Sequence, residues 1–265
     1  MKKFTIFGNP VKHSKSPQMQ NSGFKHIGLE ANYTKTKLED GDTIKELFLK
    51  NNFDGANITV PHKELAFKHA DEVIGLANQI GAANTYINQD GKVLAYNTDA
   101  PGFLKAIEEF GDIKNVLILG AGGTARALAV AFKEKGVSTT ILNRSKNRLD
   151  FFEKIGCSVS TWDDFQIASN NYKLIVNTTS AGLNDQELPS PKVLLNMIFA
   201  NAKFAVDCIY GKETPFLKIA KDKGLQYKDG EDMLLYQGVL AFELFTGCKA
   251  DKHLIEAMRK GLKEG

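Results

Sequence analysis

Short apolar runs alternate along this chain with segments whose apolar residues recur at helical spacing. Within the first hundred residues, three runs are typical of strands, namely FTIFG at 4–8, ANYTKTKL at 31–38 and GANITV at 55–60. The spacing of apolar residues between these runs predicts helices at 17–28, 42–51 and 62–70. Strands that alternate with helices in this way form parallel sheets joined by helical crossovers.

The pattern changes at ANTYINQDGKVLAYN, where two strand-like runs flank Asp90-Gly91, a typical hairpin turn. A helical segment, PGFLKAIEEFG, follows at 101–111. The alternation then begins again, with strand-like runs at 115–120, 138–144, 173–180 and 204–210. This restart predicts a second open α/β sheet, and therefore an α/β protein of two domains with a boundary near residue 100.

Composition and charge narrow the class of protein. With 265 residues, of which 43% are hydrophobic and 25% charged, the chain suits a globular protein with two cores. Its net charge of +3 gives no indication of a nucleic-acid partner. No run reaches the roughly 18 apolar residues of a membrane span. The apolar run before Gly8 is four residues long, too short for a signal sequence.

The cysteines indicate the redox compartment. Cys157, Cys208 and Cys248 are odd in number and widely spaced, and no metal-binding pattern surrounds them. We therefore expect reduced thiols, a cytoplasmic protein and no bound metal.

The segment LILGAGGTARALAV carries a glycine pattern between a strand and a helix. Gly120 suits the tight turn, and Gly122 lets the backbone approach a pyrophosphate at the start of a helix near Gly123. Ala125 takes the third position, where a small residue lets the helix pack on the sheet. The pattern alone is weak, but the strand before it and the second strand that ends about 20 residues later indicate a dinucleotide cofactor.

The end of that second strand predicts which dinucleotide is bound. An acidic residue there would accept hydrogen bonds from the ribose of NAD and would repel a 2′-phosphate. This chain instead has Asn143, Arg144 and Ser145, followed by Lys146. Arg144 can hold a phosphate through two hydrogen bonds, with its neighbours as neutral partners, so we predict NADP. The alternative is that Arg144 is only an exposed basic residue at a strand end.

Polar residues of the first hundred positions are candidates for a substrate site. Ser14 and Ser16 precede a helix that begins near Pro17, so they could cap the helix or could hold a carboxylate. Taken singly, each serine is more often a cap.

Further candidates follow predicted strands. Asn57 and Thr59 lie at the carboxyl end of one strand and Lys63 on the next turn, where open α/β sheets bind ligands. Asn84 and Asp99 flank the predicted hairpin, and Asp99 could cap the helix that follows it. Each of these residues alone favours a structural role.

Taken in order, nine short segments are similar to the motifs of one family. They are HSKSP, GANITVPHK, GAANT, YNTDA, GAGGTAR, NRS, NTTSAG, DCIYGKETPF and GEDMLLYQGVLAFELFTG. From His13 to Gly247, the chain therefore resembles the shikimate dehydrogenase family. The resemblance implies a two-domain enzyme that reversibly reduces 3-dehydroshikimate to shikimate with NADPH, in the pathway to aromatic amino acids.

The resemblance also implies an organisation and a set of site residues. Residues 1–100 would form the substrate-binding and catalytic domain, 101–232 a Rossmann-type NADP-binding domain, and 233–265 helices that return to the first domain. Substrate contacts are implied for Ser14, Ser16, Asn57, Thr59, Lys63, Asn84, Asp99, Tyr210 and Gln237. Cofactor contacts are implied for Gly120, Ala121, Gly122, Gly123, Thr124, Ala125, Asn143, Arg144, Ser145, Thr178, Gly230 and Met233.

Lys63 and Asp99 would carry the proton chemistry of that reaction. Hydride addition to a ketone develops negative charge on oxygen, and a lysine ammonium can donate the proton required there. In the reverse direction the amine accepts it. Asp99 would orient the lysine and bind a ring hydroxyl. The resemblance permits a homodimer and gives no indication of a metal, a nucleic acid or a membrane.

Some positions depart from the family pattern. Ala95 and Ala100 stand where glycine is usual, and a methyl group there could move the loop that holds Asp99. His62 stands where an aromatic or apolar residue is common, and we expect it to pack rather than to catalyse. His13 has no metal-binding pattern around it and is interpreted in the same way.

Three other functions remain open at this stage. A quinate/shikimate dehydrogenase with dual cofactor use shares the predicted architecture, although Asn-Arg-Ser favours NADP. A methylene-tetrahydrofolate dehydrogenase would lack the combination of SKS and NTTSAG. An NADP sensor without enzymatic activity would tolerate the loss of Lys63 or Asp99, and both are present.

Overall fold

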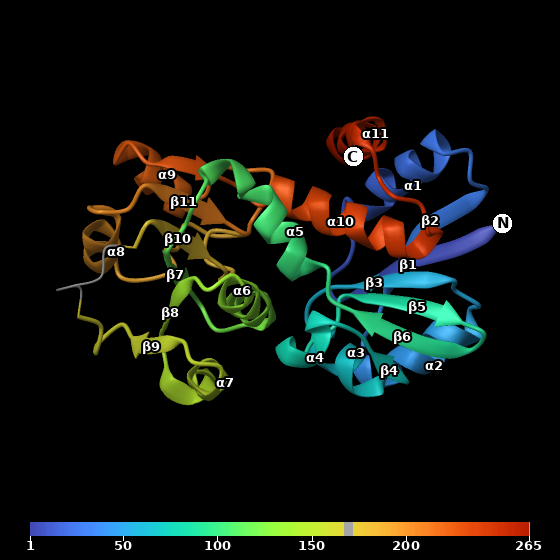
Figure 1. The fold of residues 1–265 in the computed structure, drawn as a ribbon, viewed down its shortest axis with the longest axis horizontal. Helices are drawn as coiled ribbons and strands as arrows, with labels where there is room; N and C mark the ends of the chain where they lie inside the picture. Colours follow the sequence, from blue (N-terminus) through green and yellow to red (C-terminus); the bar gives the residue numbers. More distant parts are fainter. Residues whose placement is uncertain (167–171, 265) are drawn as a thin grey trace. The chain divides into compact units, whose positions relative to one another are not determined.

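The computed structural model describes residues 1–166 and 172–264, which form two compact α/β units (Figure 1). The first unit comprises Met1–Gly102 and Leu235–Gly265, and the second comprises Phe103–Leu234. Residues 167–171, in the predicted second domain, and residue 265 lie outside the described residues. The predicted two-part α/β class is confirmed. The chain passes between the units within helices, once in α5 (Asp99–Ala106) and once in α10 (Glu231–Thr246).

The sheet of the first unit is mixed, with the order β2-β1-β3-β5-β6-β4 in the described residues. Its strands are β1 (Lys2–Gly8), β2 (Ala31–Lys37), β3 (Gly55–Ile58), β4 (Glu72–Val73), β5 (Thr85–Gln89) and β6 (Lys92–Tyr96). Strand β1 is parallel to β2 and β3, as the alternation predicted. The predicted hairpin joins β5 to β6, and because β5 is antiparallel to β3, it breaks the parallel pattern.

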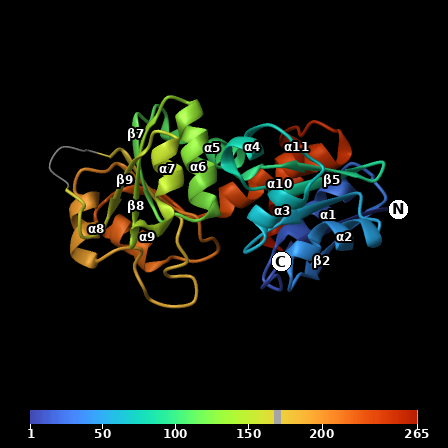
Figure 2. The same ribbon diagram turned by 90° about the horizontal axis from the view of Figure 1, so that it is seen from below.

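Helices cover both faces of this sheet (Figures 1 and 2). One face carries α2 (Ile44–Lys50), which follows a 3-10 turn at Gly41–Thr43, and α3 (Lys63–His69). The other face carries α1 (Ser16–His26), α10 and α11 (Lys252–Lys263), while α4 (Leu76–Ile80) precedes the hairpin. Rings of Phe4, Phe24 and Phe242 stack in sequence, with centroids 5.0 and 5.1 Å apart. The last helices of the chain therefore complete the core of the first unit.

The sheet of the second unit is wholly parallel, with the order β12-β11-β10-β7-β8-β9 in the described residues. Its strands are β7 (Asn115–Leu119), β8 (Ser138–Asn143), β9 (Ser158–Thr161), β10 (Leu174–Asn177), β11 (Phe204–Asp207) and β12 (Gln226–Lys228). The pattern predicted the four inner strands. The edge strands β9 and β12 were missed, because three or four residues are too few to show a period.

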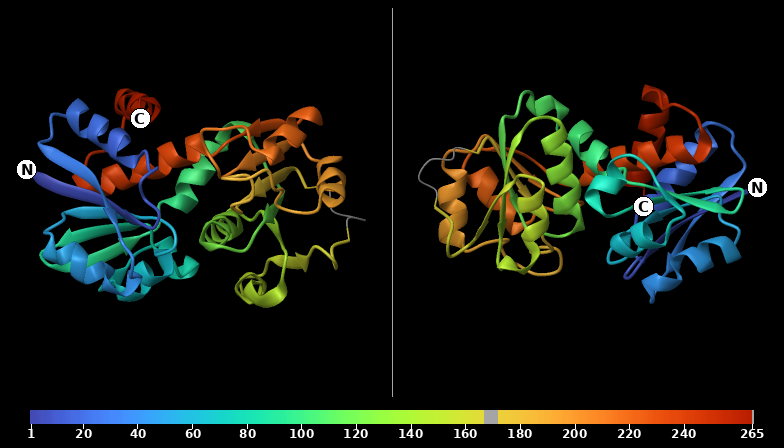
Figure 3. Two further views of the ribbon diagram at one scale, coloured as in Figure 1. Left: turned by 180° about the vertical axis from the view of Figure 1, so that it is seen from behind. Right: turned by 60° about the horizontal axis from the view of Figure 1, so that its bottom comes forward.

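Helices lie on both faces of the second sheet (Figure 3). Its apolar side chains pack alternately into the core on each face. Val116 and Ile118 pack toward α6 (Gly123–Glu134) and α7 (Asp150–Lys154). Leu117 and Leu119 pack toward α8 (Lys192–Phe199) and α9 (Pro215–Asp222). Short 3-10 turns lie at Glu108–Phe110 and Lys146–Arg148. Because all strands are parallel, the turns after β7, β8, β10 and β11 lie at one edge of the sheet, where open α/β sheets bind ligands.

No helix of the described chain has both the length and the apolar composition needed to cross a membrane.

Phe242 tests whether the C-terminal helices hold the first unit together. Phe242→Ala deletes a fully buried ring, so we expect the first unit to lose about 3–5 kcal/mol of unfolding free energy. Urea unfolding followed by circular dichroism measures the change. Val193→Ala, on the surface of α8, is the control and should shift stability by less than about 0.5 kcal/mol. Equal effects of the two substitutions would contradict the packing described here.

Candidate active site

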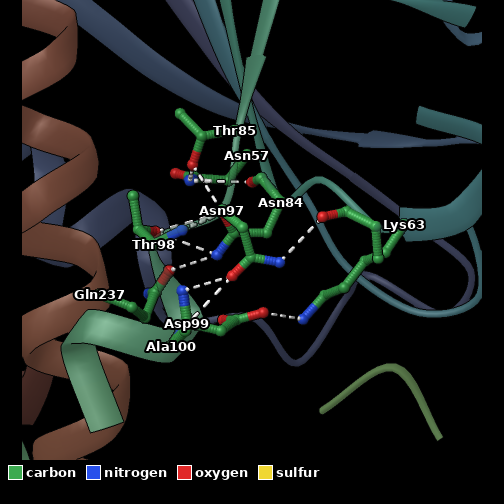
Figure 4. Close-up of polar contacts among 10 residues, drawn as sticks. Asn57, Lys63, Asn84, Thr85, Asn97, Thr98, Asp99, Ala100 and Gln237 are labelled. Carbon is green, nitrogen blue, oxygen red and sulfur yellow. Dashed lines mark hydrogen bonds and ion pairs between the residues drawn. The ribbon is translucent and has the colours of Figure 1, made fainter. Parts of the chain in front are cut away.

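A largely buried ion pair joins Lys63 to Asp99 in the first unit (Figure 4). The Nζ of Lys63 lies 2.6 Å from Oδ2 of Asp99, and the two side chains are 18% and 8% exposed. Lys63 is the first residue of α3 and Asp99 the first residue of α5. The sequence separates them by 36 positions, so the fold of the first unit brings them together.

The cap of α5 explains why the Asp99 carboxylate is available to Lys63. The Oδ1 of Asn97 accepts hydrogen bonds from the backbone amides of Asp99 and Ala100, at 3.1 and 3.4 Å. Its Nδ2 donates to the carbonyl of Ala82 at 3.0 Å. Asn97 therefore supplies the cap, and the alternative interpretation of Asp99 as the cap of this helix does not hold.

Asn84 joins the ends of the hairpin to α10. Its Oδ1 accepts hydrogen bonds from the Thr98 amide at 2.8 Å and from the Thr85 hydroxyl at 2.9 Å. Its Nδ2 donates to the Thr98 hydroxyl at 3.0 Å and to Oε1 of Gln237 at 3.5 Å. The buried Asn84 is thus satisfied on both sides, as a buried amide must be.

The network continues to Asn57 at the end of β3. Its Nδ2 donates to the Thr85 hydroxyl at 3.1 Å, and its Oδ1 accepts from the Tyr33 hydroxyl at 2.7 Å. Burial raises the pKa of Tyr33 well above its ordinary value, which keeps this phenol a donor. A continuous polar network therefore runs from Tyr33 to Gln237 through the first unit, and Figure 4 shows its part from Asn57 to Gln237.

Four members of this site were not among the predicted residues: Tyr33, Thr85, Asn97 and Thr98. The signal that could have found three of them is the repeated Asn-Thr pair, at 84–85 and 97–98, which interrupts the apolar pattern at each end of the hairpin. Tyr33 has no such signal, because an aromatic residue in a strand is ordinarily interpreted as core.

Other predicted substrate residues lie apart from this network. The Ser14 hydroxyl accepts the Ser16 amide at 3.3 Å, and Lys15 occupies the N-cap of α1 without a side-chain cap. Ser16 is buried, and its hydroxyl receives no hydrogen bond from a helix amide of the described chain. Thr59 follows β3, where its methyl group packs against Gly8. Tyr210 belongs to the second unit, where burial raises its pKa.

The departures from the family pattern are accommodated by burial. His62 is 3% exposed, and its Nε2 donates to the carbonyl of Leu38 at 2.7 Å, so it packs and also makes a hydrogen bond. Ala95 and Ala100 are fully buried, with their methyl groups inside the core. His13 is exposed.

In the second unit, the glycine-rich turn after β7 leaves space at the start of α6. Gly120 has a φ of +101°, and a Cβ there would lie 2.8 Å from the methyl of Thr179. At Gly122 and Gly123, by contrast, no atom of the described chain lies within 4 Å of the place a Cβ would take. Gly122 is the N-cap of α6 and provides no side-chain acceptor. The first amides of α6 therefore suit an anionic ligand group, and Ala125 behind them is buried against the sheet.

The end of β8 presents an exposed basic segment. Arg144 is exposed and forms no ion pair within 1–166 and 172–264. Asn143 Nδ2 donates to the Ser145 carbonyl at 2.8 Å, and the Ser145 hydroxyl donates to Asn147 at 2.7 Å. Lys146 is paired with Asp164 at 3.1 Å. Arg144 is thus available to a phosphate.

The remaining predicted cofactor residues lie in the same unit. The Thr178 hydroxyl donates to the Leu119 carbonyl at 2.7 Å, beside the glycine-rich turn. Gly230 approaches the Cys208 carbonyl so closely that a Cβ would lie 2.3 Å from it. Met233 packs against the core of the second unit. No group of three His, Cys, Asp or Glu side chains in the described residues is arranged to hold a metal ion.

Comparisons with known proteins point to one family. The substrate-binding domain model of shikimate dehydrogenase matches residues 6–86, and the C-terminal domain model of shikimate 5'-dehydrogenase matches residues 230–262. A shikimate dehydrogenase (NADP(+)) from Helicobacter hepaticus is 43% identical over 257 residues, covering 97% of this chain and 95% of the relative.

Solved structures give the same similarity. The shikimate 5-dehydrogenase of Thermus thermophilus, in complex with NADP(H) and shikimate, is 35% identical with a TM-score of 0.87, over 100% of this chain and 99% of that chain. The shikimate dehydrogenase of Aquifex aeolicus is 34% identical with a TM-score of 0.85, over 97% of each chain. Both similarities extend through the two units.

Gly120 and Gly122 offer a matched pair of substitutions. Gly120→Ala forces a methyl group toward Thr179 at a positive φ, so we expect a loss of about 1–2 kcal/mol of stability. Gly122→Ala, at a φ of −89°, meets open space and should change stability by less than about 0.5 kcal/mol. Thermal unfolding of the protein without ligand measures both. A Gly122→Ala protein as unstable as Gly120→Ala would show that the space beside Gly122 is filled.

Proposed function

Because the chain belongs to the shikimate dehydrogenase family, we propose that it is an NADP-dependent oxidoreductase that interconverts shikimate and 3-dehydroshikimate. The observation that carries the chemical part of the proposal is the largely buried pair of Lys63 and Asp99, which adjoins a network of buried amides and hydroxyls. Such a site suits a ligand that carries several hydroxyl groups.

Lys63 is the proposed proton donor and acceptor. When bound, the reduced cofactor would supply the hydride for reduction, and the oxidised cofactor would accept it in the reverse direction. The ammonium of Lys63 gives a proton to the ketone oxygen during reduction, and the neutral amine removes the hydroxyl proton during oxidation. Asp99 holds the amine in place and accepts a hydrogen bond from the substrate hydroxyl. Its own orientation is supported by the Asn97 cap, which leaves both carboxylate oxygens unused by the helix.

The other predicted substrate residues are proposed as binding groups. Asn57, Asn84 and Gln237 offer side chains of one network, and Thr59 follows the same strand end as Asn57. The hydroxyls of Ser14 and Ser16 are proposed to bind the substrate carboxylate, because hydroxyl donors satisfy an anion without the cost of a buried cation. Tyr210, in the second unit, is proposed as a further substrate contact.

The second unit is proposed to bind the cofactor. The open space beside Gly122 and Gly123 suits the pyrophosphate at the start of α6, and Arg144 suits the 2′-phosphate. Asn143, Ser145 and Thr178 are proposed as further polar contacts, with Gly230 and Met233 beside the nicotinamide. No disulfide joins the cysteines of the described chain, which fits the proposed cytoplasmic location.

One assay tests the whole proposal. Purified protein is mixed with shikimate and NADP⁺, and reduced nicotinamide is followed by absorbance. Quinate in place of shikimate, and NAD⁺ in place of NADP⁺, distinguish a strict shikimate dehydrogenase from an enzyme of dual specificity. Binding of NADP⁺ without turnover of either acid would favour a sensor and refute the proposed activity.

Lys63→Met tests the proton donor. The substitution keeps the apolar stem and removes the amine, so we expect kcat to fall by about 10² to 10⁴ while NADP⁺ affinity is retained. Because the Asp99 carboxylate then lacks its partner, thermal unfolding is measured in parallel and the assay is run well below the midpoint. Lys68→Met, on the exposed side of the same helix, is the control. A near-normal kcat in Lys63→Met would refute the proposed role of Lys63 and show that it is an ordinary structural lysine.

Arg144→Ala tests the cofactor. Loss of a charge-assisted hydrogen bond of about 1.5–3 kcal/mol should raise KM for NADP⁺ roughly tenfold to a hundredfold and leave KM for NAD⁺ almost unchanged. Lys154→Ala removes an exposed charge from α7 and serves as the control. Equal changes for the two cofactors would exclude Arg144 from the 2′-phosphate site.

A further inference from the structure

Asp207 is a buried carboxylate in the second unit that forms no ion pair with the described residues. It ends β11 and lies opposite Asn177, which ends β10, and both are 0% exposed. Burial raises the pKa of Asp207, and hydrogen bonds to its oxygens act in the opposite direction. A buried carboxylate is costly unless its oxygens are satisfied, so its hydrogen bonds indicate what the residue does.

Three donors satisfy the two oxygens of Asp207. Its Oδ1 accepts from Nδ2 of Asn177 at 3.1 Å and from the amide of Ile209 at 3.0 Å. Its Oδ2 accepts from the hydroxyl of Thr214 at 2.6 Å. An ionised carboxylate only accepts, so the NH₂ of Asn177 must face it and the carbonyl of Asn177 must face away.

The outward-facing oxygen of Asn177 holds the turn after β10. It accepts from the Thr179 amide at 3.0 Å and from the Thr179 hydroxyl at 2.8 Å. The same hydroxyl accepts from the amide of Ala181 at 3.2 Å. The methyl of Thr179 is in turn the group that a Cβ on Gly120 would meet. The turn at 178–181 therefore packs against the glycine-rich turn at Gly120.

The other two donors to Asp207 hold the segment at 208–214, which carries Tyr210. Ile209 is tied at its start, and its carbonyl accepts from the Gly230 amide at 2.9 Å. Thr214 is tied at its end, where its hydroxyl also accepts the Leu217 amide at 3.3 Å and caps α9. The Asp207 carboxylate thus connects the turn at 178–181 with the segment at 208–214.

We infer that Asp207 is a positioning residue of the second unit, which fixes the turns at 178–181 and 208–214 and thereby the affinity for the cofactor. The effect on affinity rests on the proposed function, since those turns support residues proposed to contact NADP. Asp207 itself touches neither cofactor nor substrate in this proposal. It acts by setting the orientation of the Asn177 amide and by holding Ile209 and Thr214.

Asp207→Leu and Asp207→Asn form the matched pair for the test. Asparagine keeps an oxygen for Asn177 and Ile209, and its NH₂ can donate to the Thr214 hydroxyl. Leucine has a similar volume and no acceptor, so it leaves the donors unpaired. We expect Asp207→Leu to raise KM for NADP⁺ about tenfold to a hundredfold, with kcat at saturating cofactor less than fivefold lower. Asp207→Asn should stay within about threefold of the unmutated protein.

If Asp207→Leu does not fold, a second and less disruptive pair of substitutions at Thr179 tests the same link. Thr179→Val removes the hydroxyl that joins Asn177 to Ala181 and keeps a methyl group toward Gly120. Thr179→Ser keeps the hydroxyl. We expect KM for NADP⁺ to rise about threefold to tenfold in the valine variant and to stay near normal in the serine variant. Equal KM values in this pair would overturn the inferred link through Asn177.

Amide hydrogen exchange of the unliganded full-length protein separates this inference from the proposed function. Asp207→Leu should accelerate exchange in both segments, 178–181 and 208–214, and Thr179→Val only in the first. Exchange that rises evenly over the second unit, with KM unchanged, would overturn the inference and make Asp207 a general stability residue. Failure of the unmutated protein to reduce NADP⁺ with shikimate would refute the proposed function, and the exchange pattern alone would then decide whether Asp207 fixes the two turns.

Discussion

Lys63 and Asp99 are both largely withdrawn from water, and neither charge would be stable there without the other. The pair therefore constrains the positions of the two helices that carry these residues. Residue 63 must begin α3 and residue 99 must begin α5, with the two helix starts close together. Asn97 caps α5 by accepting two of its first amides, so these amides do not compete with Lys63 for the Asp99 carboxylate. The polar network around the pair follows from the same need to satisfy buried groups.

The sequence predicts the broad fold because the alternation of strand-like and helical segments is long and regular. It predicts the glycine-rich turn because the positive φ of Gly120 limits the choice of residue at that position, directly between a buried strand and a helix. It does not decide between Asn97 and Asp99 as the cap. Both residue types cap helices well, and the choice depends on Lys63, a partner 36 positions away. The hydroxyl of Tyr33 was missed for the same reason, since its partner Asn57 lies on another strand.

Asparagine side chains organise both units by the same physical means. An amide has a donor on one side and an acceptor on the other, so a neighbour that fixes one side also fixes the other. In the first unit Asn97 receives two helix amides and donates to a carbonyl, and in the second Asn177 donates to Asp207 and receives Thr179. At these strand ends, the orientation of one side chain is thus passed to the next residue through hydrogen bonds.

The first unit is built from two separate stretches of chain, and this has a consequence for biosynthesis. Its sheet emerges from the ribosome early, but α10, which brings Phe242 and Phe245 to one face, and α11 are made only after the second unit. The second unit is contiguous and is complete before them. Since domains fold as they emerge, the inserted unit folds while the first still exposes an apolar face. Until α10 and α11 have been made, one apolar face of the first sheet therefore lacks two of the helices that cover it.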